Sequence, residues 1–230
     1  MSGTALEDHG DAEPPTAPAD GSPWPRWRVT KRGFDLVFAG LSLVVLSPAF
    51  LAIALAIKLD SPGPVFFRQL RIGAGKRAFR IFKFRTMVSD ADDVKRELAH
   101  LNKHARSGGD GRLFKIEDDP RVTPIGRLLR RHFLDELPQL INVVRGEMSL
   151  VGPRPLIVEE DEHVREWARM RLDLRPGMTG LWQVSGHSDI SFDEMMRLDH
   201  AYVTTWSFRN DVKLLLGTIP LVVKGDGDRY

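Results

Sequence analysis

The sequence contains no cysteine among its 230 residues. This absence excludes a disulfide scaffold, catalysis by a thiolate and zinc sites with cysteine ligands, and it is consistent with a reducing compartment. The sequence also lacks a glycine-rich phosphate-binding loop and an internal repeat, and its seven histidines form no metal-spaced pair on a predicted helix. The hydrophobic content of 42% is ordinary, which excludes a transporter with many membrane spans.

Charge of one sign is missing from two segments. Residues 1–25 contain five acidic residues and no lysine or arginine, whereas residues 61–89 contain seven lysines and arginines and no acidic residue. Because the formal net charge is only +2, this segregation indicates one surface for anionic ligands rather than a generally cationic protein. Residues 1–25 also hold five of the fifteen prolines, so we expect a disordered acidic tail there and no secretory signal.

One long segment has no charge at all. It runs from Leu36 to Ile57 and, as a helix of 22 residues, would extend about 33 Å, close to the thickness of the hydrocarbon core. Residues 26–60 are therefore predicted to form a basic, aromatic interfacial segment and a membrane helix. Ser47-Pro48 predicts a break in its middle, because proline removes a backbone hydrogen bond and the serine hydroxyl can bind a freed carbonyl.

The flanks of this apolar segment are both basic, with Lys31 and Arg32 on the N-terminal side. Basic flanks favour the cytoplasmic side of a membrane. A re-entrant helix-break-helix hairpin keeps both flanks on that side, whereas a kinked spanning helix places one flank outside. The physical pattern alone leaves these two arrangements open.

Residues 61–230 are predicted to form a small cytoplasmic catalytic domain, which gives an α+β fold class overall. Strands are expected at residues 65–67 and 78–84, and helices at residues 124–146 and 211–224. Residues 159–169 are expected to form a solvated helix, residues 182–187 a strand and turn, and residues 105–112 a flexible loop.

Two adjacent carboxylates, Asp135 and Glu136, follow a segment with four arginines and no acidic residue, which is an unusual arrangement. Acids in the first turn of a helix are also a common structural feature, so spacing alone leaves their role open. Further along, Arg154 lies between two prolines and Arg175 precedes Pro-Gly. Such stiff turns suit phosphate binding, because the guanidinium loses little conformational entropy there.

Seven motifs carry a resemblance that covers about residues 28–225, and one of them is the apolar helix broken at Ser47-Pro48. The other six are Lys31-Arg-Gly-Phe-Asp35, Phe82-Lys-Phe-Arg-Thr-Met87, Asp119-Pro-Arg-Val-Thr123, Leu134-Asp-Glu-Leu-Pro-Gln-Leu140, Val151-Gly-Pro-Arg-Pro155 and Arg175-Pro-Gly-Met-Thr-Gly-Leu-Trp-Gln183. In this order they resemble the bacterial sugar transferases, also called monotopic phosphoglycosyl transferases or polyprenyl-phosphate sugar phosphotransferases.

The resemblance implies an enzyme that transfers a sugar 1-phosphate from a UDP-sugar to undecaprenyl phosphate and releases UMP, as the first membrane step of exopolysaccharide, capsule or glycan synthesis. It implies a monotopic protein of the cell membrane, with a re-entrant hairpin, amphipathic interfacial helices and the active site on the cytoplasmic face. Asp135 would form a covalent phosphosugar-aspartyl intermediate, and Glu136 with Asp135 would bind Mg²⁺. The expected substrate-binding residues are Arg154, Lys83, Arg85, Arg121, Arg175, Gln183 and His187.

Two residues depart from the family pattern. Phe133 stands where a serine or threonine is usual, so it cannot form a capping box with Glu136, and His187 stands where an arginine is usual. These departures are the only support for an alternative function as a catalytically degenerate scaffold of a polysaccharide assembly pathway. Nucleic-acid binding through the basic segment is discounted, because few exposed aromatic residues accompany it. A homodimer is a hypothesis, and the sequence does not identify the sugar.

Overall fold

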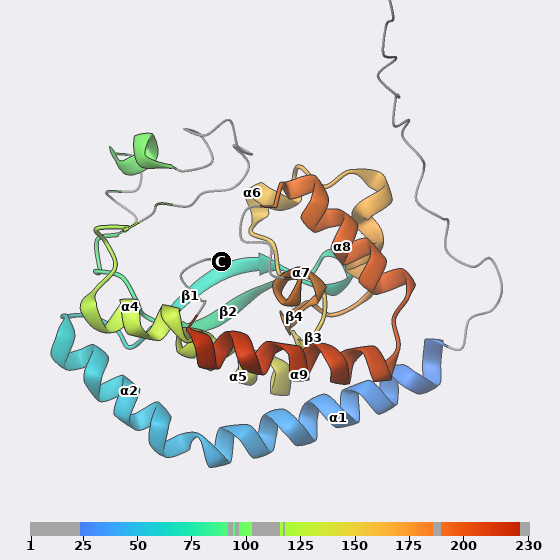
Figure 1. Ribbon diagram of the computed structural model, residues 1–230, viewed down its shortest axis with the longest axis horizontal. Helices are drawn as coiled ribbons and strands as arrows, with labels where there is room; N and C mark the ends of the chain where they lie inside the picture. The colour runs from blue at the N-terminus through green and yellow to red at the C-terminus, as the bar shows by residue number, and fades with distance from the viewer. Residues whose placement is uncertain are drawn as a thin grey trace, which may run out of the picture.

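The computed structural model describes residues 24–91, 94, 97–102, 116, 118–185 and 190–225, with side chains from Val29 onward except that of residue 99. Helices and two small sheets alternate along the chain, which confirms a mixed, α+β-like fold (Figure 1). The predicted acidic tail lies outside the described residues except for Trp24 and Pro25, which begin the first helix. The predicted loop at residues 105–112 also lies outside them.

The elements follow one another with short connections. The α-helices are α1 (Trp24–Val45), α2 (Ser47–Asp60), α4 (Pro124–Arg131), α5 (Gln139–Arg145), α6 (Val158–Asp161), α7 (Leu181–Val184), α8 (Phe192–Thr204) and α9 (Phe208–Lys224). The strands are β1 (Phe66–Ile72), β2 (Ala78–Phe84), β3 (Ser149–Val151) and β4 (Gly177–Thr179), and the 3-10 helices are η1 (Ala74–Lys76), η2 (Glu97–Leu101), η3 (Leu134–Glu136) and η4 (Glu166–Asp173).

The N-terminal apolar segment forms two helices, α1 and α2, with a bend of 60° between them (Figure 1). Pro48 has no N–H to donate to the Val44 carbonyl, and the Ser47 hydroxyl donates to this carbonyl instead at 2.8 Å. The predicted break at Ser47-Pro48 is therefore confirmed. In the part of the chain that the structure describes, no single helix passes as a membrane span, whereas α1 from Val29 onward and α2 pass together on length and composition.

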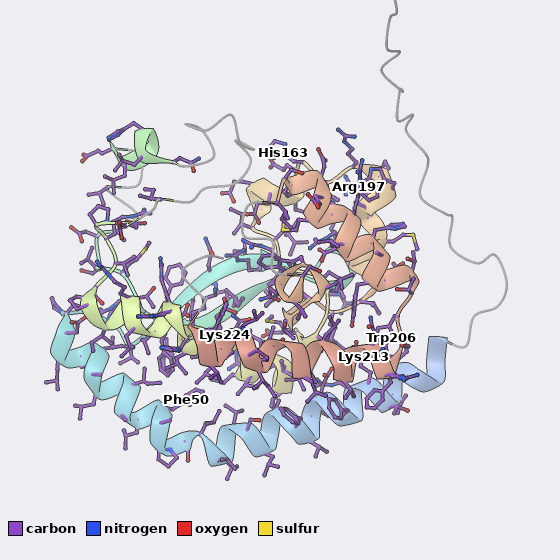
Figure 2. All side chains as sticks on the ribbon, in the orientation of Figure 1. Phe50, His163, Arg197, Trp206, Lys213 and Lys224 are labelled. Atoms are coloured by element: carbon purple, nitrogen blue, oxygen red, sulfur yellow. The ribbon has the colours of Figure 1, made fainter. Side chains whose placement is uncertain are left out.

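The outer side of this bent pair is apolar and exposed. Val37, Leu51 and Leu59 are 72%, 74% and 80% exposed, and the side chains along this edge are mostly hydrocarbon (Figure 2). The charged residues of α2 are confined to its last turn, where Lys58 and Asp60 lie. A surface of this kind suits lipid, but the placement in a membrane stays a prediction.

Two basic side chains of α1 join the bent pair to the rest of the protein. Lys31 is buried and donates to Asp211 Oδ2 at 2.5 Å and to the Val151 carbonyl at 3.0 Å. Arg32 donates at 2.5 and 2.9 Å to two carbonyls at the end of α5. We predicted these two residues as part of a membrane-contacting segment, and the structure gives them protein partners, because α1 packs on the domain along this face. A role in lipid binding stays untested.

The antiparallel hairpin of β1 and β2 confirms the two predicted strands, although β1 extends further than expected. Lys83 and Phe82 are consecutive in β2, so their side chains project from opposite faces of the hairpin. The face with Lys83 is turned toward η3 and the predicted carboxylates. The basic block at residues 61–89 therefore does not form one surface, because strand geometry divides its side chains between two faces.

The parallel pair of β3 and β4 brings two of the motifs together. The backbones of Gly152 and Gly177 lie so close that a Cβ atom on Gly177 would be 2.1 Å from the Gly152 nitrogen. Both positions therefore require glycine. This contact places the turn with Arg154 beside the turn with Arg175, which explains why both motifs combine glycine, proline and arginine.

Three smaller predictions have mixed outcomes. The helix predicted for residues 211–224 is confirmed as α9. The strand predicted from Trp182 is wrong for its described part, because the chain forms the short helix α7 and packs it against α8. The solvated helix over residues 159–169 is also wrong. The chain forms α6 and η4 instead, Glu160 and Asp161 are buried, and the Glu160 carboxylate accepts from the Ile157 N–H at the start of α6.

Candidate active site

The segment with Asp135 and Glu136 is not one continuous helix. The helix predicted over residues 124–146 is divided into α4, η3 and α5, and the division occurs at Phe133, whose φ of 54° and ψ of 18° are left-handed. A left-handed residue cannot continue a right-handed helix. Phe133 provides no side-chain cap for η3, in agreement with the expectation from its missing hydroxyl. The interruption sets Asp135 and Glu136 on a short turn between two helices.

The two carboxylates have different surroundings. Asp135 is only 8% exposed, and burial, the largest cause, raises its pKa to about 6. The carboxylate of Glu136 raises this pKa further, whereas the charges of Lys83 and Arg130 lower it and offset part of the burial. Asp135 thus has a carboxylate whose pKa lies close to neutral pH, as expected for a reactive group rather than for a surface acid.

Glu136 is more accessible and has a cationic partner. Lys83 Nζ lies 2.6 Å from Glu136 Oε1, and each side chain is 24% exposed. Arg130, at the end of α4, donates to the Thr86 hydroxyl at 2.9 Å and adds positive charge beside Asp135. The structure therefore brings together Asp135, Glu136 and Lys83, three residues of the predicted site, and adds Arg130, which sequence reasoning did not select from its run of arginines.

Arg154 is held in place by more than its two prolines. Its guanidinium carbon lies 4.9 Å from the centre of the Trp182 ring, and its Nη2 lies 3.9 Å from Glu160 Oε1. Its backbone N–H donates to Asp199, and its carbonyl accepts from Arg171, while Arg171 and Asp199 form a buried ion pair. This support, which sequence analysis missed because its residues are far apart in the chain, fixes the Arg154 turn.

Arg71 binds the Arg154 turn and is influenced by the charge of Glu136. Burial, the largest cause, and the nearby charge of Arg154 lower the pKa of Arg71 to about 10, and Glu160 and Glu136 oppose this effect. Arg71 donates to the Pro155 carbonyl at 2.9 Å and to the Gln69 side chain at 2.6 Å. Sequence analysis did not select Arg71. Alternation along β1 places its side chain on the hairpin face that also carries Lys83.

Two predicted substrate-binding arginines have structural partners instead. Arg85 is buried and donates at 2.7 and 2.8 Å to the Ser61 and Pro62 carbonyls, in the turn after α2. Arg121 is buried and forms a two-atom pair with Asp119, with its Nη2 at 2.7 Å from Oδ2. These contacts favour a structural role for both, and their binding of substrate stays a prediction.

Two of the last three predicted residues bind backbone carbonyls, and the third lies outside the described residues. Arg175 is exposed and donates to the Gly146 carbonyl at the end of α5, at 2.7 Å. Gln183 donates to the Met178 carbonyl at 3.2 Å. His187 lies outside the described residues. A substrate role for each of the three stays a prediction.

The described residues contain no cluster of three or more His, Cys, Asp or Glu side chains that could hold a metal ion by themselves. Mg²⁺ usually binds proteins through one or two carboxylates and completes its coordination with water and substrate phosphate. Asp135 and Glu136 provide a donor set of that size. The residues present therefore fit Mg²⁺ if a diphosphate substrate supplies further oxygens.

Comparisons with known proteins identify the family of this chain. A family model described as "Bacterial sugar transferase" matches residues 26–225. The exopolysaccharide production protein ExoY of Sinorhizobium fredii is 42% identical over 199 residues, which are 86% of this chain and 88% of the relative. The UDP-glucose:undecaprenyl-phosphate glucose-1-phosphate transferase of Caulobacter vibrioides is 42% identical over 217 residues, which are 90% of this chain and 75% of the relative.

A third relative is the undecaprenyl-phosphate galactose phosphotransferase of Salmonella typhimurium, 40% identical over 200 residues, which are 87% of this chain and 42% of the relative. The chain thus spans less than half the length of several curated relatives, and most of the length of others. The family match covers both carboxylates, the Arg154 turn and the bent helix pair together, and on this basis the chain belongs to the bacterial sugar transferase family.

Proposed function

We propose that this protein transfers a sugar 1-phosphate from a UDP-sugar to undecaprenyl phosphate and releases UMP. The observation that carries the proposal is the buried carboxylate of Asp135, with Glu136 and Lys83 beside it. Relatives of this chain are named as glucose-1-phosphate and galactose phosphotransferases that use undecaprenyl phosphate, which supports the same class of donor and acceptor here.

The reaction divides into two displacements at one phosphorus atom. In the first, an Asp135 oxygen attacks the phosphorus next to the sugar, and the bond from this phosphorus to the oxygen shared with the uridine-side phosphate breaks. UMP leaves, and a phosphosugar-aspartyl intermediate remains. In the second, an oxygen of undecaprenyl phosphate attacks the same phosphorus, the bond to Asp135 breaks, and the product is undecaprenyl diphosphate sugar with a free Asp135 carboxylate.

The surrounding residues have separate tasks in this scheme. Asp135 must be ionised to attack, and the charges of Lys83 and Arg130 favour that form. Arg154, with the support of the Trp182 ring, is placed to bind phosphate oxygens through its guanidinium edge. Asp135 and Glu136 would hold Mg²⁺, which would neutralise developing charge on the diphosphate.

We further propose that the bent pair α1 and α2 enters one leaflet of the cell membrane as a re-entrant hairpin and leaves the rest of the chain on the cytoplasmic side. The exposed apolar edge of α1 and α2 supports this, as do the exposed Leu216, Ile219 and Val223 of α9, the helix that Lys31 binds through Asp211. The phosphate of a polyprenyl carrier lies at the membrane surface, so this placement would bring it within reach of Asp135.

The test is UMP release from a panel of UDP-sugars by purified protein in nanodiscs with undecaprenyl phosphate and Mg²⁺. We expect release with one sugar, loss of turnover in Asp135→Asn, a severe reduction in Glu136→Gln and loss after EDTA treatment. A matched control, Glu166→Gln, changes an acidic side chain of η4 that is 89% exposed and should retain activity. An Asp135→Asn variant that keeps most of its UMP release would disprove the covalent mechanism.

The alternative is a degenerate, membrane-associated scaffold, and the left-handed Phe133 beside the carboxylates is the structural feature that favours it. It predicts no UMP release from any UDP-sugar by folded, membrane-bound protein, together with co-purification of other pathway enzymes. The same panel of UDP-sugars therefore decides between the two functions.

A further inference from the structure

Two arginines on the hairpin face opposite Lys83 have no part in the proposed reaction. Arg68 of β1 and Arg145 at the end of α5 place their guanidinium carbons 4.7 and 4.9 Å from the centre of one ring, that of Phe82. Arg68 and Phe82 are opposed across the hairpin, so they share a face, whereas Lys83 projects from the other face toward Glu136. Two cations are thus held on one aromatic side chain.

The described part of the chain provides neither arginine with an acidic partner or a hydrogen-bond acceptor. Residues 61–89, which include Arg68, contain no acidic residue. Both arginines are exposed, and their guanidinium N–H groups have no hydrogen-bond acceptor among the described residues. Like charges held near one ring repel each other, and a bound anion would remove that cost, since guanidinium edges match phosphate oxygens.

The same face of the hairpin leads directly to the bent helix pair. Two cross-strand pairs away from Arg68 and Phe82, on the same face and about 7 Å along the strands, the rings of Phe66 and Phe84 stack with centres 5.5 Å apart. The Phe84 ring in turn contacts Phe50 of α2, with centres 5.3 Å apart, and Figure 2 labels Phe50 on that helix. These ring contacts connect the face that carries the arginine pair to α2.

The second arginine approaches the bent pair from α5. Arg145 follows Val144, whose carbonyl accepts a hydrogen bond of 2.9 Å from Arg32 of α1. Arg32 and Arg175 both bind carbonyls at the end of α5, so capping of that helix explains them. Capping does not explain Arg68 or Arg145, because their described contacts are with the Phe82 ring.

We propose that Arg68, Arg145 and Phe82 form a binding site for the phosphate headgroup of an anionic membrane phospholipid, such as phosphatidylglycerol. Charge complementarity selects an anion, and Arg32, which binds the end of α5 next to Arg145, belongs to the basic segment that the proposed hairpin keeps at the level of the lipid headgroups. The inference rests on the membrane association proposed above and not on the transfer reaction. It assigns the two faces of the hairpin different ligands, with the substrate phosphates on the Lys83 face and a structural lipid on the Phe82 face.

The test counts the lipids that remain bound to the full-length protein in native mass spectrometry, after equilibration with equal amounts of phosphatidylglycerol and phosphatidylcholine in detergent. The variant Arg68→Gln/Arg145→Gln is expected to retain about tenfold less phosphatidylglycerol. The control Lys76→Gln/Arg77→Gln removes the same charge from the tip of the same hairpin and is expected to retain the original amount. The double lysine variant Arg68→Lys/Arg145→Lys is expected to lie between them.

Several results would overturn the site. Equal retention of phosphatidylglycerol by all the variants would overturn it. If the double glutamine variant also unfolds at a lower temperature while its lipid retention is unchanged, the arginines only cover Phe82 and bind no lipid. An equal loss in the hairpin-tip control would indicate general charge attraction, and displacement by millimolar inorganic phosphate would indicate a soluble anion. Sedimentation with phosphatidylcholine vesicles reports on the bent pair alone, and its failure in the unaltered protein would contradict the membrane association instead.

Discussion

Lys83 Nζ lies 2.6 Å from Glu136 Oε1, and this ion pair connects strand β2 to the turn that carries Asp135. Both members are a quarter exposed, whereas Asp135 beside them is buried. Lys83 also acts on Asp135, because its charge lowers the pKa that burial raises. One lysine thus influences both carboxylates, although it contacts only one of them.

Replacement of Lys83 tests this double role. In Lys83→Gln the pKa of Asp135 is expected to rise further above its ordinary value, and UMP release at pH 7 is expected to fall by about 10²-fold, since a charged donor at the site is lost. The measurement is kcat/KM as a function of pH, with Lys76→Gln as a matched control that should behave as the unaltered protein. An acid limb that does not move in Lys83→Gln would contradict the electrostatic link.

The unaltered protein should show its own pH dependence. The attacking Asp135 must be ionised, and its pKa is raised to about 6 by burial. We therefore expect kcat/KM to fall about tenfold for each pH unit below about 6 and to level off above it, at constant Mg²⁺. A profile that stays flat down to pH 5 would show that Asp135 ionises as an ordinary surface acid.

The same raised pKa predicts an opposite effect on stability. Because Asp135 binds its proton more tightly in the folded state than in the unfolded state, its contribution to stability falls as the pH rises from about 4 to about 6. Above that range the buried charge costs about 2 to 3 kcal/mol, from a shift of about two pKa units. Asp135→Asn should therefore be inactive but more stable at pH 7.5 and no more stable at pH 4, as measured by chemical unfolding in detergent.

The buried pair of Lys31 and Asp211 should dominate the attachment of α1. Asp211 also accepts from the Tyr202 hydroxyl at 2.7 Å and from the Trp206 ring at 3.2 Å, so loss of Lys31 leaves a buried charge without its cation. Lys31→Met should lower the free energy of unfolding by about 3 to 5 kcal/mol. The double variant Lys31→Met/Asp211→Leu should recover part of this loss, and strictly additive effects would contradict a coupled pair.

The absence of cysteine makes the topology of the bent pair directly testable. Single cysteines at Thr4→Cys and His163→Cys should both be protected from a membrane-impermeant maleimide in intact cells and both be labelled after lysis. Reaction of Thr4→Cys in intact cells would instead indicate a spanning helix. Ser47→Ala/Pro48→Ala restores helical hydrogen bonding at the break, so in this background we expect part of the Thr4→Cys population to become accessible from outside.

Local patterns predicted the elements whose cause is local. Pro48 removes a specific hydrogen bond, so the break between α1 and α2 followed from its position, and the local sequence predicted β2 fully and β1 in part. Phe133 was different, because no propensity assigns a left-handed conformation to phenylalanine, and the helical spacing over residues 124–146 concealed the division there. The helix α7 has only four residues, too few for any period to identify.

The site showed the same division between local and distant causes. Asp135 and Glu136 were visible as neighbours in the sequence, and Lys83 through its motif. Arg71 and Arg130 were not selected, because the residues that they bind are far from them in the sequence. Conversely, Arg85 donates its hydrogen bonds to carbonyls in the turn after α2. A basic sequence motif does not reveal whether its cations bind a ligand or a backbone carbonyl.

The ion pair between Lys31 and Asp211 joins residues 180 positions apart. During synthesis the chain emerges from its N-terminus at about 5–20 residues per second, so Lys31 exists without its partner for roughly 10 to 40 s. Throughout that interval α1 can reach a membrane but cannot complete its attachment to the domain. Ordered packing of the N-terminal helix is thereby tied to the completion of translation, and a chain cut short before α9 would keep a lysine that the finished protein buries.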